Sequence, residues 1–168
     1  MGAYQKSNVI GGQVLTPVCA EDWSPDPQRE QVIDKVLGQL RERGIVAEWS
    51  IQLGGFAVIG ADSNGVKALL NELPKEQRGS RAFPLQLPLH SAFHTSLMNE
   101  TSARAVAELS DLNFQAPTVP LIDGRGFVFK PISANPEELR QYTLGHQVTE
   151  AYDYTNSLKS ALHHLAPD

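Results

Sequence analysis

The chain has 168 residues, 41% of them hydrophobic, and its 14 basic and 19 acidic residues give a net charge of -5 at pH 7. This composition is typical of a globular protein with one ordinary domain or two small subdomains, and it excludes a disordered chain. Because there is no basic stripe, nucleic acid is not expected as a partner. No run reaches the roughly 20 apolar residues of a membrane span, and no signal peptide is evident, which favours a cytoplasmic protein without a membrane partner. A single cysteine, Cys19, excludes an internal disulfide framework.

The sequence begins with a strand pattern followed by an amphipathic helix. The strand is predicted over residues 13–18, and Asp26 is placed to cap the helix with Pro27 at its first position. Gly44 is the expected end of this helix. Its predicted apolar face consists of Val32, Ile33, Val36, Leu37 and Leu40.

A hairpin and a second helix are expected next. Strand patterns over residues 45–52 and 56–59 flank Leu53-Gly54-Gly55, which contains the glycines that tight turns need. A helix then starts after Asp62-Ser63-Asn64 and stops at Pro74, and residues 81–87 supply another strand. The apolar positions of this helix are Val66, Leu69, Leu70 and Leu73. The order β-α-β-β-α-β predicts a ferredoxin-like arrangement over residues 9–87, with two helices on one face of a four-stranded antiparallel sheet.

The second half, residues 88–168, has a different pattern. A helix is predicted over residues 96–109, and short strands over 118–122 and 127–129 flank an Asp123-Gly124 turn. Asn135-Pro136 starts another helix that ends near Gly145. A last helix is predicted over residues 152–165 with Leu158, Ala161, Leu162 and Leu165 on one side. These elements leave apolar faces without a sheet to cover them, which predicts a fragment of a larger protein, and Met1-Gly2-Ala3-Tyr4-Gln5 is typical of the interior of a longer chain.

Two local patterns suggest chemistry but have simpler explanations. Ala61-Asp62-Ser63-Asn64-Gly65 lies between a strand and a helix, as a hydrolase nucleophile elbow does, yet Asp, Ser and Asn are also the usual helix caps. Capping is the favoured interpretation. His90 and His94 have the spacing of two metal ligands, but no cysteine or paired carboxylate joins them, so no metal site is predicted. His163-His164 is interpreted as a solvated helix end.

Several segments resemble one enzyme family. Residues 87–98 contain Ser91-Ala92-Phe93-His94-Thr95 followed by Ser-Leu-Met. This segment is similar to the catalytic-histidine motif of malonyl-CoA:acyl-carrier-protein transacylases and polyketide-synthase acyltransferase domains. Residues 112–122 resemble the family's Phe-x-Ala-Pro-x-x-Pro strand entry. Residues 147–154 are similar to its Gln-x-x-x-Pro-Val-x-Trp stretch, with Ala151 and Tyr154 in place of the Pro and Trp. Residues 50–60 resemble the hairpin that contacts the acyl thioester arm.

The resemblance implies a fold and a reaction. The fold is α/β (α+β), with the ferredoxin-like small subdomain followed by the carboxy-terminal part of an α/β-hydrolase-like acyltransferase core. In the family, a serine takes the acyl group from acyl-CoA and passes it to the phosphopantetheine thiol of an acyl carrier protein. His94 would be the general base, and the backbone carbonyl of Gln147 would orient its ring. Implied substrate contacts are Gln52, Phe93 and Met98. Acyl-CoA and the carrier protein are the implied partners, and no further cofactor is expected.

The family's nucleophile motif is absent from this sequence. No Gly-x-Ser-x-Gly occurs in the 168 residues, which predicts that the serine lies outside them and that the chain alone is inactive. Met1-Gly2 occupies the place where malonyl-selective members have an arginine before a glycine, so a monocarboxylic acyl group or hydrolysis of acyl carriers stays open. Two other hypotheses also stay open: a self-contained serine hydrolase using Ser63, and a non-catalytic module that docks a carrier protein.

Overall fold

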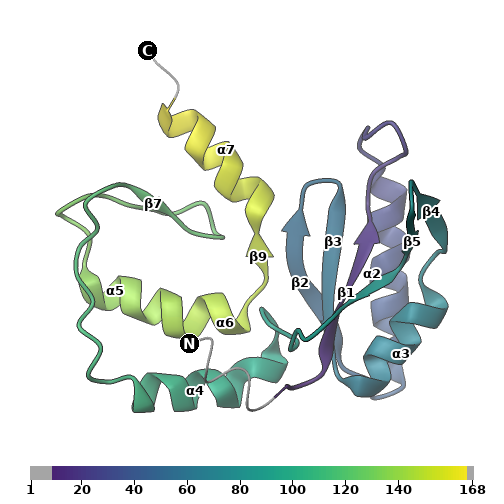
Figure 1. Cartoon of the computed structure of the whole chain (residues 1–168), viewed down its shortest axis with the longest axis horizontal. Helices are drawn as coiled ribbons and strands as arrows, with labels where there is room; N and C mark the ends of the chain where they lie inside the picture. Colours follow the sequence, from purple (N-terminus) through teal and green to yellow (C-terminus); the bar gives the residue numbers. More distant parts are fainter. Residues whose placement is uncertain (1–8, 166–168) are drawn as a thin grey trace.

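The computed structural model describes residues 9–165. A five-stranded mixed sheet with the strand order β6-β1-β3-β2-β9 joins the two halves of the chain (Figure 1). The elements of the first half are β1 (Gly12–Pro17), α2 (Pro27–Glu42), β2 (Ala47–Leu53), β3 (Phe56–Ala61), α3 (Ser63–Glu72), β4 (Glu76–Arg78), β5 (Arg81–Phe83) and β6 (Leu85–Leu87). Pairing among β6, β1, β3 and β2 is antiparallel throughout. The mixed α/β class predicted from the sequence is therefore confirmed.

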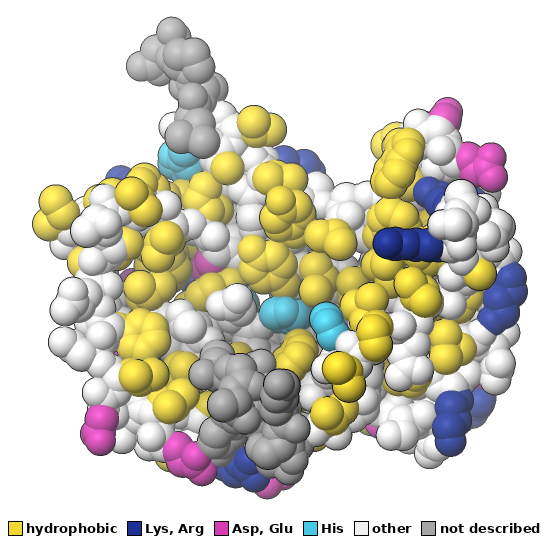
Figure 2. Space-filling view, in the orientation of Figure 1, with side chains coloured by type: hydrophobic (Ala, Val, Ile, Leu, Met, Phe, Trp, Pro, Cys, Tyr) yellow, Lys and Arg dark blue, Asp and Glu magenta, His cyan; other side chains and the backbone are white. Residues whose placement is uncertain are grey.

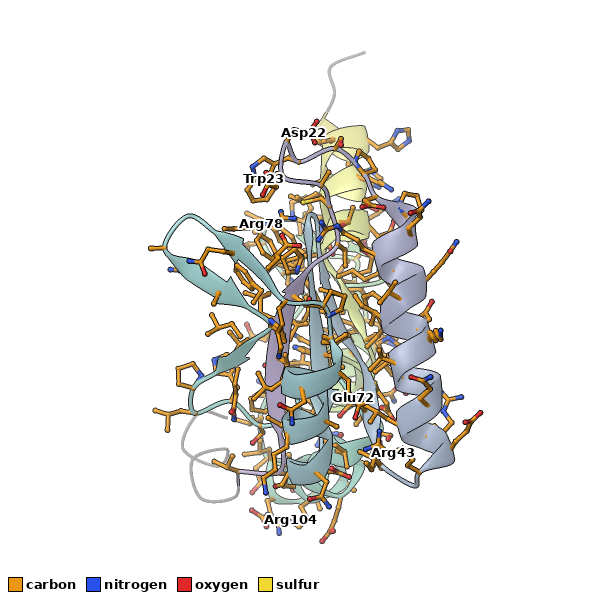
Figure 3. The ribbon with its side chains drawn as sticks, turned by 90° about the vertical axis from the view of Figure 1, so that its right-hand side faces the viewer. Asp22, Trp23, Arg43, Glu72, Arg78 and Arg104 are labelled. Atoms are coloured by element: carbon orange, nitrogen blue, oxygen red, sulfur yellow. The ribbon has the colours of Figure 1, made fainter. Side chains whose placement is uncertain are left out.

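Helices α2 and α3 pack on one face of the sheet and enclose the main apolar core (Figure 3). Asp26 caps α2 by accepting a hydrogen bond from the amide of Gln28. The buried face of α2 is Ile33, Val36, Leu37 and Leu40. The prediction that Val32 belongs to this face was wrong, because it lies beside the i, i+3, i+4, i+7 stripe and is 40% exposed.

An ion pair marks the place where these two helices end. The guanidinium of Arg43 lies 2.7 Å from the carboxylate of Glu72, and the two side chains point toward each other in Figure 3. Because both side chains are partly exposed, such a pair contributes about 1 kcal/mol or less. The buried apolar residues, including Leu40 and Leu69 at 0% exposure, therefore hold the helices to the sheet.

The strand predicted over residues 81–87 is divided into two strands. β5 pairs with β4 as a small hairpin, whereas β6 pairs with β1 at the edge of the main sheet. Pro84 lies between β5 and β6 and has no amide hydrogen to donate to a ladder. The chain therefore changes partners at this residue, and the prediction of one continuous strand was wrong.

The second half consists mainly of helices beside the sheet (Figure 1). Its elements are η1 (Ser96–Met98), α4 (Asn99–Glu108), β7 (Leu121–Ile122), β8 (Val128–Phe129), α5 (Pro136–Gln141), η2 (Tyr142–His146), α6 (Gln147–Thr149), β9 (Tyr152–Asp153) and α7 (Tyr154–Leu165). Strands β7 and β8 pair as the turn at Asp123-Gly124 predicts. Only the last two residues of the strand predicted over 118–122 belong to this ladder.

Two predicted helix ends differ in the structure. The helix that starts after Asn135 does not end near Gly145, because a π-helical turn, η2, carries it into α6. The last helix begins at Tyr154 rather than at residue 152, because Tyr152 and Asp153 pair in parallel with Ile51 and Gln52 of β2. On α7, Leu158 is 46% and Leu162 is 72% exposed, so these two positions of its predicted apolar side are not covered by the described residues.

Candidate active site

His94 lies in the loop between β6 and η1, where its main chain and its ring are held by the same segment. The amide of His94 donates to the carbonyl oxygen of Val148 at 2.9 Å. Its Nδ1 is hydrogen-bonded to the carbonyl oxygen of Gln147. A carbonyl oxygen can only accept, so the neutral ring carries its proton on Nδ1 and keeps a lone pair on Nε2. This is the tautomer that a general base requires.

Burial keeps the His94 ring in its neutral form. Removal from water lowers the pKa of His94 below its ordinary value of 6.5, while the hydrogen bond to Gln147 opposes this shift. The ring is therefore available to accept a proton at neutral pH. Figure 2 shows histidine side chains at the centre of one face, below a hollow that is bordered by hydrophobic side chains of both halves.

Two aromatic rings contact the imidazole. Tyr152 lies with its ring centroid 5.7 Å from that of His94, and Phe93 lies edge-on at 6.5 Å. Tyr152 in turn covers Gly124, where an added Cβ would collide with the tyrosine ring. Tyr152 was missed as a site residue because the sequence pattern assigned it to a helix, although it lies in the segment that resembles the family's Gln-x-x-x-Pro-Val-x-Trp stretch.

The segment around His94 is fixed to the sheet by its neighbours. Thr95 is 1% exposed, and its hydroxyl donates to the carbonyl oxygen of Ala92 at 2.6 Å. The amide and hydroxyl of Ser96 donate to the two carboxylate oxygens of Glu48 on β2, at 2.8 and 2.5 Å. These contacts tie the loop to the first half of the chain immediately after His94.

The other predicted site residues occupy three different environments. Phe93 is half-buried beside His94, whereas Gln52 is exposed on β2 opposite Asp153 of β9. Met98 is 1% exposed at the end of η1. Their roles as substrate contacts stay predictions. Met1 lies outside the described residues. It occupies the place where malonyl-selective members of the family have an arginine that pairs with the substrate carboxylate.

Ser63 is exposed at the first turn of α3, where its neighbour Asp62 accepts hydrogen bonds from the amides of Asn64 and Gly65 at 2.9 and 2.7 Å. Asp62 therefore caps the helix. Among the described residues no hydrogen bond joins Ser63 to a histidine.

A pocket of about 640 Å³ lies elsewhere, between the loop after β1 and the β4-β5 hairpin. Its lining includes Trp23, Phe56 and Arg78, of which Figure 3 labels Trp23 and Arg78. The guanidinium of Arg78 lies 5.9 Å from the centre of the Phe56 ring. His94 does not line this pocket.

Residues 9–165 contain no cluster of three or more His, Cys, Asp or Glu side chains that could hold a metal ion. In that part of the chain no helix combines the length and the apolar character needed to cross a membrane.

The fold has the architecture of the malonyl-CoA:acyl-carrier-protein transacylases, as the sequence resemblance predicted. The chain superposes on the transacylase of Synechocystis with a TM-score of 0.68 at 18% identity, over 96% of this chain and 49% of that one. For MCAT from Streptococcus pneumoniae the TM-score is 0.68 at 22% identity, with 99% and 50% covered. For a malonyl-transacylase in complex with a type II polyketide-synthase acyl carrier protein it is 0.66 at 16%, with 97% and 48% covered. The chain thus spans about half the length of the solved structures it matches. No family model and no curated protein matches the sequence.

Proposed function

We propose that this chain is the carboxy-terminal portion of an acyl-carrier-protein acyltransferase. In this proposal residues 9–87 form its ferredoxin-like small subdomain, and residues 88–168 belong to the α/β-hydrolase-like core. The antiparallel order β6-β1-β3-β2 with two helices on one face supports the first assignment. The exposed Leu158 and Leu162 of α7 support the second, because a larger core would cover them.

The proposed reaction is a two-step acyl transfer through a serine located outside these residues. The serine hydroxyl attacks the thioester carbonyl of acyl-CoA while Nε2 of His94 accepts its proton. The C–S bond then breaks, and the coenzyme A sulfur leaves with that proton. In the second step the phosphopantetheine thiol of the carrier protein gives its proton to His94 and attacks the acyl-serine ester, and the serine oxygen recovers the proton. The observation that carries the proposal is the hydrogen bond from Nδ1 of His94 to the Gln147 carbonyl, which leaves Nε2 free to act.

The proposed substrate contacts lie on β2 and within residues 93–98. Gln52, Phe93 and Met98 are proposed as contacts of the acyl thioester, with the half-buried Phe93 favouring small acyl groups by its volume. The acyl carrier protein and acyl-CoA are the proposed partners, and the reaction needs no further cofactor. One of the matched structures is a complex of a malonyl-transacylase with its carrier protein, which supports a carrier protein as acceptor. The cytoplasmic location stays a prediction.

Acyl transfer by the longer protein that contains this chain tests the proposal. His94→Ala should reduce transfer from acyl-CoA to carrier protein by several orders of magnitude, because the base is lost. Ser63→Ala is the matched control and should leave transfer intact, since Ser63 is exposed at the start of α3. The opposite pattern would favour a hydrolase that uses Ser63. If neither substitution changes the reaction but the carrier protein still binds, a docking module becomes the better explanation.

A further inference from the structure

The face of the sheet opposite α2 and α3 buries two polar side chains. Gln13 on β1 is 1% exposed and Ser50 on β2 is 0% exposed. Their neighbour Val14 packs into the core between sheet and helices, and successive side chains of a strand alternate between faces, so Gln13 points to the side of the second half. Buried amide and hydroxyl groups cost free energy unless they have hydrogen-bond partners.

These side chains and His90 form a hydrogen-bond network that ends at the main-chain carbonyl of Phe93, the residue before His94. His90 Nδ1 lies 2.8 Å from Oε1 of Gln13, and Nε2 of Gln13 donates to the hydroxyl of Ser50 at 2.7 Å. The Ser50 hydroxyl donates to the carbonyl oxygen of Phe93 at 2.8 Å, and Nε2 of Gln13 also reaches this oxygen at 3.3 Å.

Each hydrogen bond in this network has a defined donor and acceptor. The Phe93 carbonyl can only accept, so Ser50 must donate to it and must itself accept from Gln13. The reverse orientation of the Gln13 amide would place its carbonyl oxygen 3.3 Å from the Phe93 carbonyl oxygen, with two acceptors facing each other. Oε1 of Gln13 therefore faces His90, whose Nδ1 must carry a proton to donate.

The last hydrogen bonds of this network fix one particular peptide bond. The Phe93 carbonyl and the His94 amide belong to the same peptide plane, and Val148 accepts from that amide on its other side at 2.9 Å. With both polar groups of the plane held, rotation about the next bond sets where the His94 side chain points. That rotation has a φ of 60°, a left-handed value that residues other than glycine rarely adopt.

We infer that His90, Gln13 and Ser50 are positioning residues, which act through the Phe93–His94 peptide to hold the His94 ring against the Gln147 carbonyl. This inference rests on the proposed function for the catalytic importance of His94. It assigns to the first half of the chain a part in orienting the base, in addition to the contacts that come from residues 147 and 148.

Imidazole nitrogen NMR on the full 168-residue chain labelled with ¹⁵N-histidine tests the geometry without any substitution. The neutral His90 and His94 rings should both carry their proton on Nδ1. Finding the proton of neutral His90 on Nε2 would overturn the inference, because Gln13 would then have no donor from that side.

Substitutions test whether the chain of bonds reaches His94. Gln13→Met keeps the length of the side chain but removes its hydrogen bonds, and it should shift the His94 ring signals and reduce the Nδ1–H form. Ser50→Ala should do so more weakly, because Gln13 still reaches the Phe93 carbonyl, and Ser50→Thr should restore the native signals. Thr16→Val, at a buried polar position on the same strand, is the control and should leave His94 unchanged. If Gln13→Met alters His90 but leaves His94 as it is in the control, the inference is wrong.

Kinetics of the longer acyltransferase separate this inference from the proposed function. Gln13→Met should lower kcat by roughly tenfold with KM for acyl-CoA within about twofold, as expected when a base is misplaced rather than removed. If His94→Ala leaves transfer unchanged, the proposed function fails, while the ring signals of the 168-residue chain still decide the positioning role.

Discussion

Gly60 on β3 lies directly against Thr95, so that a Cβ added to the glycine would be 2.6 Å from Cγ2 of the threonine. This separation is far below an ordinary van der Waals contact. The loop that carries His94 therefore rests on the sheet with no space for a further methyl group. The glycine lets a strand of the first half support the loop that follows β6.

We predict that Gly60→Ala lowers the free energy of unfolding by about 1–3 kcal/mol, because the extra methyl group has to displace Thr95. Gly38→Ala is the matched control. Gly38 lies within α2 with nothing near its Cβ position, so alanine should stabilise the protein by about 0.5–1 kcal/mol. Urea unfolding of the two variants measures the difference. Equal stabilities would show that the loop can move away from β3 at no cost.

A second prediction concerns the cap of α3. The Asp62 carboxylate accepts from the amides of Asn64 and Gly65, and also from the amide of Val46 at 3.2 Å. Asp62→Ala should therefore cost about 1–2 kcal/mol, whereas Ser63→Ala at the exposed neighbouring position should change stability by less than about 0.5 kcal/mol. Thermal or urea unfolding checks both values. A larger loss for Ser63→Ala than for Asp62→Ala would contradict this assignment of the cap.

The sequence predicted the first half well, because its elements are local. The Asp26 cap, the turn at Gly54-Gly55 and the stop at Pro74 all depend on residues close to one another in the chain. The partner change at Pro84 was not predicted, because residues 81–87 have one continuous strand pattern and the choice between β4 and β1 is made by tertiary contacts.

Predictions for the second half failed where distant segments meet. The pair Tyr152–Asp153 has no strand pattern of its own, and it becomes β9 because β2 offers it a free edge. The chain of bonds through Gln13 and Ser50 joins residues far apart in the sequence, and a buried glutamine has no local signature. The contact between His94 and Gln147 was expected from family resemblance, not from spacing.

A third prediction tests whether Tyr152 supports the site. Gly124→Ala should push the tyrosine ring away from the turn, since the added Cβ would occupy its place. Stability should fall by about 1–3 kcal/mol, and the NMR signals of the His94 ring, 5.7 Å from Tyr152, should shift. Gly145→Ala is the control, because nothing lies near its Cβ position and neither readout should worsen. A destabilised Gly124→Ala protein with native His94 signals would mean that Tyr152 does not influence the His94 ring.

The last prediction follows from the lowered pKa of His94. Burial places this pKa below 6.5, so between the two values the unfolded chain binds more protons at this ring than the folded chain does. The free energy of unfolding therefore rises with pH in that window. The contribution of the neutral ring is fully present above pH 6.5 and is lost as the pH falls through the folded-state pKa.

His94→Gln tests this linkage, because an amide nitrogen can still donate to the Gln147 carbonyl but does not titrate. The variant should lose less stability than the native chain when the pH is lowered from 7 toward 5, as measured by urea unfolding at a series of pH values. The other histidines are present in both proteins, so the difference between the two pH profiles isolates His94. Parallel profiles would mean that burial does not lower the pKa of His94 below its ordinary value.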